Sequence, residues 1–126
     1  MTELPTAQEL GDGLCVEPFS VTVTTAQDKF VVTWDYEGVP VGHAVVGLYD
    51  AGDVFVEFFE FVVRDEFRGR GLFTQALRWS GGKGRRARIA ASTPERDFYV
   101  SAGFVEHGDW LLQDKRKSAS WLKGQK

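Results

Sequence analysis

Residues 54–77 read VFVEFFEFVVRDEFRGRGLFTQAL, and this stretch decides the fold. Its first part, residues 54–63, is an almost continuous run of β-branched and aromatic side chains, which is typical of a central strand of a sheet. The glycine-rich segment 68–71 (RGRG) follows, and residues 72–77 then place apolar side chains on one helical face. The stretch therefore predicts a strand, a tight turn and a short helix that ends at Gly81-Gly82.

The turn at residues 68–71 has the features of an anion-binding site. A glycine-rich turn between a strand and a helix directs backbone N–H groups and the positive helix end toward one point. Gly69 and Gly71 allow the main chain to approach a phosphate closely. Arg68 and Arg70 add forked, positively charged donors, so a pyrophosphate is the expected ligand. The turn is no Walker A loop, because the only Gly-Lys pair follows the helix instead of preceding it.

The rest of the chain predicts a mixed sheet. Alternating apolar and polar side chains predict strands over residues 19–24, 29–36 and 41–49, before the central strand. After the helix, the pattern predicts a strand over 87–91, a helix that starts within 92–95 and ends at Gly103, and short strands at 104–105 and 110–112. The expected fold class is therefore α/β, a mostly antiparallel mixed sheet with two main helices in the order β-β-β-β-α-β-α-β-β.

Domain organisation follows from the same patterns. Residues 1–17 show no sustained period and are expected to form a loosely ordered arm, residues 18–114 a single domain, and residues 115–126 a basic C-terminal tail. A length of 126 residues with 43% hydrophobic content is typical of one globular domain. The N-terminus lacks the pattern of a signal peptide, and no apolar stretch approaches the ~20 residues that span a bilayer, so the cytoplasm is the expected location.

Cysteine and charge content narrow the ligand classes further. Cys15 is the only cysteine, and with His43 and His107 it forms no cluster at metal-ligand spacing, so no metal site is expected. Residues 1–63 carry a net charge of −10 and residues 64–126 a net charge of +7. The basic half favours an anionic ligand such as a phosphate, and the acidic half favours a cationic group such as an amine.

A second motif, residues 96–104 (RDFYVSAGF), lies about thirty residues after the turn, on a predicted helix that ends in a glycine before a strand. Together the two motifs resemble the GNAT superfamily of acyl-CoA-dependent N-acetyltransferases. The family's pyrophosphate loop reads Arg or Gln, two residues, Gly, one residue, then Gly or Ala, and Arg68, Gly71 and Phe73 occupy these positions. Phe73 departs from the family pattern and would either crowd the diphosphate or turn outward.

The resemblance implies a GNAT-like fold with a trimmed N-terminal half. Family members usually carry two helices between their first two strands, whereas here only residues 25–29 separate the strands. Without these helices the acceptor site would be open. An open site could accept a macromolecular substrate, could be completed by a second subunit, or could belong to a chain that has lost activity. Exposed sheet edges and the missing helices leave room for a homodimer.

The implied activity is transfer of an acetyl or other acyl group from acetyl-CoA to a primary amine by direct attack. The implied cofactor-binding residues are Phe61, Val62, Val63, Arg68, Gly69, Arg70, Gly71, Leu72, Phe73 and Thr74. A backbone N–H near Phe61 or Val62 would stabilise charge on the reacting carbonyl oxygen. Tyr99, on the family's tyrosine helix, is the candidate general acid for the departing thiolate.

A base is also needed, because an amine with a pKa of about 10.4 is mostly protonated at neutral pH. Glu57, at a position where some family members carry a glutamate base, is the first candidate, and Glu60 is the second. Successive strand residues point to opposite faces, so only one of them can share the cleft face with Phe61. The parity of the strand favours Glu57 as that residue.

A second class of function stays open, a non-catalytic module that binds a protein or nucleic acid. Its basic contact residues would be Lys83, Arg85, Arg86, Arg88 and the C-terminal tail. Nucleic acid is less favoured, because the basic residues near Arg86 have no aromatic neighbours on which nucleobases could stack. For the enzyme, the acceptor is an amine on a small molecule or a macromolecule.

Overall fold

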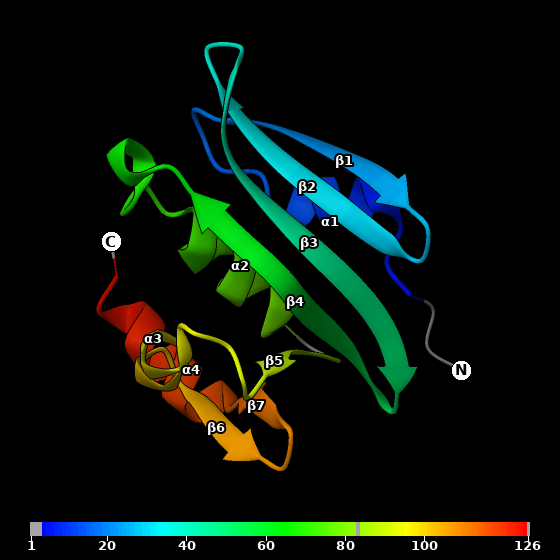
Figure 1. Ribbon diagram of the computed structural model, residues 1–126, viewed down its shortest axis with the longest axis vertical. Helices are drawn as coiled ribbons and strands as arrows, with labels where there is room; N and C mark the ends of the chain where they lie inside the picture. The colour runs from blue at the N-terminus through cyan, green and yellow to red at the C-terminus, as the bar shows by residue number, and fades with distance from the viewer. Residues whose placement is uncertain (1–3, 83, 126) are drawn as a thin grey trace.

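The fold is built around one seven-stranded sheet in the order β1-β2-β3-β4-β5-β7-β6 (Figure 1). The computed structural model describes residues 4–82 and 84–125. Every neighbouring pair of strands is antiparallel except β4 and β5, which are parallel, so the predicted mixed and mostly antiparallel sheet is confirmed. The strands are β1 (Ser20–Ala26), β2 (Lys29–Tyr36), β3 (Val39–Ala51), β4 (Asp53–Val63), β5 (Arg85–Ala90), β6 (Phe104–His107) and β7 (Trp110–Gln113).

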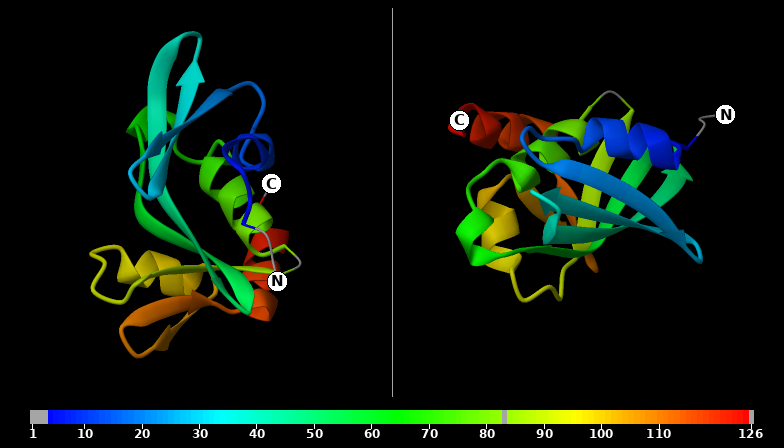
Figure 2. Two further views of the ribbon diagram at one scale, coloured as in Figure 1. Left: turned by 90° about the vertical axis from the view of Figure 1, so that its right-hand side faces the viewer. Right: turned by 90° about the horizontal axis from the view of Figure 1, so that it is seen from above.

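The described residues also form four α-helices and one 3-10 turn. They are α1 (Ala7–Gly13), η1 (Asp65–Phe67), α2 (Leu72–Ser80), α3 (Arg96–Ser101) and α4 (Lys115–Lys123). The left view of Figure 2 shows α1, α2 and α4 along one side of the sheet. On the other side, β1, β2 and β3 have no helix against them in the part of the chain that the structure describes. No helix within 4–82 and 84–125 has the length and apolar content needed to cross a membrane.

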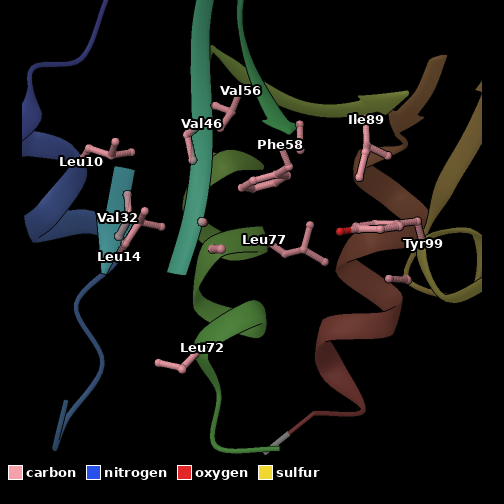
Figure 3. Packing of buried hydrophobic residues seen from close by; sticks show 14 of the residues in the cluster. Leu10, Leu14, Val32, Val46, Val56, Phe58, Leu72, Leu77, Ile89 and Tyr99 are labelled. Atoms are coloured by element: carbon pink, nitrogen blue, oxygen red, sulfur yellow. The ribbon is translucent and has the colours of Figure 1, made fainter. Parts of the chain in front are cut away.

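The core lies between the sheet and these helices. On β2, Val32 and Trp34 are fully buried, as the alternating pattern predicts. Side chains from the helices meet side chains from the strands there, and Figure 3 shows Leu77 of α2 between Phe58 of β4 and Tyr99 of α3. The sheet and the helices therefore share one continuous core, which fixes α2 and α3 relative to β4.

Strand β4 contains a bulge that the sequence pattern does not reveal. Val45 of β3 pairs with Glu60, and the next β3 residue, Val46, pairs with Phe58, so Phe59 is an extra residue in β4. An extra residue reverses the alternation of side chains beyond it. Before Phe59 the even-numbered residues of β4 share one face of the sheet, and after Phe59 the odd-numbered residues share that face. This reversal decides which face the carboxylates of β4 occupy.

Strand β4 also separates from β5 halfway along its length. The parallel pairing runs from Val54 with Arg85 to Glu57 with Arg88 and ends there. Beyond that point β4 pairs with β3 alone, and β5 pairs with β7. The second half of β4 consequently has main-chain groups without a strand partner on its β5 side.

The N-terminal segment differs from the loosely ordered arm that the sequence predicts over residues 1–17. Residues 1–3 lie outside the described residues, and α1 begins with a capping box between Thr6 and Glu9, with two N–H···O bonds of 3.2 Å. Leu10 and Leu14 are buried in the core, and the Trp34 Nε1 donates to the Leu14 carbonyl at 2.9 Å. The helix is too short to show a periodic pattern of apolar residues, so Leu10 and Leu14 were the apolar positions that could indicate it.

The C-terminal segment likewise holds a docked helix where a basic tail is expected over residues 115–126. Asp114 caps α4 by accepting from the backbone N–H groups of Arg116 and Lys117, each at 3.0 Å. Ser118 is buried and accepts a hydrogen bond from the Gln113 side chain at 2.9 Å. Gly103, with φ +100°, lies so close to the Ser118 backbone that a Cβ there would clash.

Replacing Leu10 by Ala should lower the free energy of unfolding by about 3 kcal/mol, because it removes a fully buried side chain and leaves a cavity. Urea denaturation measures the change, and the exposed Gln8→Ala variant on the same helix is the control, with an effect below about 0.5 kcal/mol. Equal stability of the two variants would show that α1 does not contribute to the core.

Candidate functional site

The glycine-rich turn connects β4 to α2 as the sequence predicts. Gly69 and Gly71 have φ values of +77° and +92°, which are strained for any residue with a Cβ. Gly71 is the N-cap of α2 and has no side chain to satisfy the first N–H groups of the helix. These donors, and the positive end of a nine-residue helix, are therefore available to an anion.

Arg68 stands beside this turn with most of its side chain exposed. Its Nε donates to the Val63 carbonyl at 3.4 Å and lies 3.3 Å from an Asp65 carboxylate oxygen. Arg70 stacks on the Phe67 ring, with its guanidinium carbon 5.6 Å from the ring centroid. Two guanidinium groups therefore lie beside the turn, and that of Arg68 belongs to a side chain that lines the pocket.

A pocket of about 510 Å³ opens beside the turn. Eight of the ten predicted cofactor-binding residues line it, namely Phe61, Val63, Arg68, Gly69, Gly71, Leu72, Phe73 and Thr74. Val62 and Arg70 do not, because Val62 points to the opposite face of the sheet and Arg70 lies over Phe67. The pocket thus has a polar end at the turn and an apolar end formed by β4 and α3, which fits a diphosphate joined to an uncharged chain.

Phe73 faces the pocket and does not turn outward. Its ring centroid lies 5.0 Å from that of Phe98, 5.3 Å from Phe61 and 5.7 Å from Tyr99. Side chains from β4, α2 and α3 therefore form one aromatic cluster around Phe73. The large side chain at this position therefore forms part of the pocket wall.

Tyr99 lies at the apolar end of this pocket and is only 5% exposed. Its ring packs on Phe104 at a centroid distance of 5.3 Å, and its hydroxyl points into the interior, toward Leu77 (Figure 3). Burial, and secondly the charge of Glu95, raise the pKa of the Tyr99 phenol to about 12. The phenol therefore keeps its proton at neutral pH, as a general acid must.

Glu57 does not share the pocket face with Phe61, and the prediction from strand parity is wrong. Glu57 pairs with Gly47 of β3, and Phe61 pairs with Ala44, which puts the two β4 side chains on opposite faces of the sheet. The bulge at Phe59 is the physical reason, because it reverses the alternation between the two positions.

The second candidate, Glu60, lies on the same face as Glu57. It pairs with Val45 in the β3 register, and its carboxylate lies 3.2 Å from His43 Nε2. Both carboxylates thus face away from the pocket, and the expectation that one of them shares its face is wrong as well. Glu57 nevertheless stands at the last residue pair of the β4–β5 ladder, where the pairing of the two strands ends.

Five lining residues were not among the predicted site residues: Phe67, Glu95, Phe98, Trp121 and Gln125. The last two come from the C-terminal segment, where the Trp121 ring lies 6.0 Å from the Phe73 ring. Asp114 before a run of helix-forming residues was an available start signal for α4. Nothing in the sequence indicates that this helix reaches the pocket, since that contact joins residues 48 positions apart.

The family model of the acetyltransferase (GNAT) family matches residues 7–104. The match spans most of the chain, and the chain therefore belongs to the GNAT acetyltransferase family. The seven-stranded sheet and the glycine-rich loop before α2 agree with this membership. The activity of the family is acyl-CoA-dependent acetyl transfer.

Solved structures with the same fold are similar to this chain at low sequence identity. A GNAT family acetyltransferase from Elizabethkingia anophelis with acetyl-CoA bound is 12% identical, with a TM-score of 0.54 over 79% of this chain and 99% of that chain. The Bacillus subtilis N-acetyltransferase YlbP, in complex with coenzyme A, is 12% identical, with a TM-score of 0.50 over 65% of each chain. A comparison with curated protein sequences finds no match.

The raised pKa of Tyr99 gives a pH-dependent contribution to stability. The unfolded phenol has a pKa of about 10, and the folded one about 12, so the contribution is intact below pH 10 and is lost as the pH rises toward 12. Urea denaturation of wild type and Tyr99→Phe at pH 9 and pH 12 should show their stability difference change by about 2 kcal/mol, with wild type losing more. A constant difference would show that the phenol is not buried in solution.

Proposed function

We propose that this chain transfers an acetyl group from acetyl-CoA to a primary amine by direct attack of the amine. One observation carries the proposal: the loop with uncapped helix N–H groups and the apolar pocket are contiguous, and Tyr99 lies at the far end of that pocket. Acetyl-CoA supplies an activated thioester, and its diphosphate and pantetheine arm have the polar and apolar character of the two pocket ends. The Elizabethkingia anophelis structure supports this, since almost its whole chain aligns and it holds acetyl-CoA.

Within this proposal the chain's own groups have separate tasks. Gly71 and the first turn of α2 bind the diphosphate through backbone N–H groups, and Arg68 adds a charged donor. The unpartnered main chain of β4, near Phe61, stabilises charge on the carbonyl oxygen. Tyr99 donates the proton that the departing thiolate needs.

The proton of the amine goes to Glu57 in this proposal. The amine approaches from the sheet face opposite the pocket, where Glu57 stands beside the separation of β4 and β5. Glu60 is the alternative base, although its carboxylate is farther along β4 and is paired with His43. Transfer is direct, because Cys15, the only cysteine, is outside the pocket lining and offers no thiol for an acyl-enzyme.

The non-catalytic alternative receives less support from the side chains it would use. Arg85 donates to the Trp79 carbonyl at 2.8 Å and stacks on its ring, and Arg88 is bonded to Glu57. The Arg85 guanidinium is engaged within the molecule, and the Arg88 side chain is only 21% exposed, which leaves little of either for the surface of a nucleic acid or a protein partner. Lys83 lies outside the described residues.

Acetyl-CoA at a hundredfold excess over its Kd should raise the melting temperature by roughly 5–10 °C. Arg68→Ala should reduce the shift and Gly71→Ala should abolish it, because an alanine at φ +92° is strained and adds a Cβ beside the anion. Arg78→Ala, on the same helix but outside the pocket, is the matched control and should keep the full shift. A wild-type protein without any shift would contradict the proposed cofactor.

Tyr99→Phe tests the acid role separately from binding. Removal of the hydroxyl should lower kcat by about a hundredfold while the acetyl-CoA melting shift persists, because the ring still packs on Phe73 and Phe104. Steady-state release of CoA thiol with an amine acceptor provides the measurement. An unchanged kcat would assign the thiolate's proton to another donor.

A further inference from the structure

The sheet face opposite the pocket carries an ion pair at the point where β4 and β5 separate. Arg88 Nε and Nη2 donate to the same Glu57 oxygen, Oε1, at 3.1 and 3.0 Å. The two residues form the last pair of the parallel ladder, so no strand hydrogen bonds join β4 and β5 beyond them. A group bound at this pair therefore lies next to the main chain of β4 that faces the pocket on its other side.

Aromatic rings hold the guanidinium of Arg88 in place. Its central carbon lies 4.1 Å from the ring centroid of Trp110, 5.0 Å from Tyr49 and 5.3 Å from Phe55. These rings come from β7, β3 and β4, so the arginine is fixed by three different strands. A planar guanidinium held in this way presents its remaining donors in a constant direction.

The pair keeps unused hydrogen-bonding groups on both partners. An arginine has five N–H donors, and within residues 4–82 and 84–125 the Arg88 donors engage only Glu57 Oε1. Glu57 Oε2 accepts no hydrogen bond from any described residue, and neither it nor an Arg88 nitrogen is among the buried polar atoms without a partner. The side chains are 21% exposed for Arg88 and 9% for Glu57, so solvent reaches part of each.

We infer that this pair is the acceptor site and that the acceptor is a free α-amino acid, an inference that rests on the proposed function. A carboxylate oxygen beside N–H donors is complementary to a zwitterion, whose ammonium and carboxylate are joined through one carbon. Glu57 Oε2 binds the amino group, and the unused N–H donors of Arg88 bind the carboxylate. The small exposed surface of the pair favours a small acceptor over a protein chain.

The chemical step balances with these groups. The bound ammonium gives one proton to Glu57, and the neutral nitrogen forms a bond to the carbonyl carbon of the thioester. The C–S bond breaks, and the departing sulfur takes the proton of Tyr99. A second proton leaves the nitrogen to solvent as the amide forms, the Glu57 proton exchanges with solvent, and the Tyr99 phenolate is reprotonated from solvent. The products are an N-acetyl amino acid and CoA.

The test compares three acceptors that differ only in the group beside the amine: L-phenylalanine, L-phenylalaninamide and phenethylamine. With acetyl-CoA, kcat/KM for the amino acid should exceed that for the other two by about tenfold or more, because only it offers a carboxylate to Arg88. In Arg88→Lys the charge remains but the fork is lost, so the preference should fall below about threefold, through a higher KM for the amino acid. Arg86→Lys, on the same strand and the same face, is the matched control and should keep the preference.

A binding measurement supplies a readout that is independent of turnover. In the presence of saturating CoA, L-phenylalanine should raise the melting temperature of wild type and of Arg86→Lys, but not that of Arg88→Lys. The amide and the amine should give no shift at the same concentration. Melting temperatures without ligands show whether each variant is folded.

The outcomes separate the inference from the function on which it rests. Equal kcat/KM for all three acceptors, or a preference for the amide, which resembles a peptide N-terminus, would overturn the α-amino acid assignment and leave acetyl transfer in place. A preference that survives Arg88→Lys would overturn the role of Arg88. A wild-type protein that shows neither an acetyl-CoA melting shift nor turnover of any amine would refute the proposed function itself.

Discussion

The register of β4 is the constraint on which the rest of the molecule depends. One residue, Phe59, is inserted relative to β3, and the ladder to β5 ends at Glu57. The insertion places Phe61 in the pocket and both candidate carboxylates on the other face, and the end of the ladder leaves this part of β4 without pairing to β5. Without the bulge, a carboxylate would lie among aromatic side chains in the pocket, where its charge would be costly to bury.

The sequence predicted those parts of the fold whose signals are local and repeated. Strand β2 was predicted over its observed residues, with Val32 and Trp34 on the buried face, and β4 and α2 were predicted because a long apolar run and two glycines mark their boundary. The short helix α1 has a capping box at Thr6 and Glu9, but too few residues to show a period. Helix α4 is polar on most positions and is held by contacts with Gly103 and Gln113, which the sequence does not reveal.

The candidate site also has parts that the local sequence predicts and parts that depend on contacts between distant segments. The turn with Gly69 and Gly71 was predictable because the strand, the glycines and the helix are contiguous in sequence. The position of Tyr99 at the pocket was predictable because Tyr99 belongs to a short, contiguous motif. The face on which Glu57 lies was not, since it depends on how β4 aligns with a neighbouring strand. The contribution of Trp121 to the pocket was hidden for a similar reason, because its neighbours come from α2 and α3.

In the proposed site, the two substrates bind on opposite faces of the sheet, at the point where the pairing of β4 and β5 ends. The pocket opens on the helix-covered side of the sheet, and the Glu57–Arg88 pair is exposed on the other. In the proposed arrangement neither substrate crosses the path of the other, so geometry imposes no order of arrival and no order of departure. A molecule bound to one side leaves the other side accessible, and the two sides of the sheet can change independently, one with the acyl donor and the other with the acceptor.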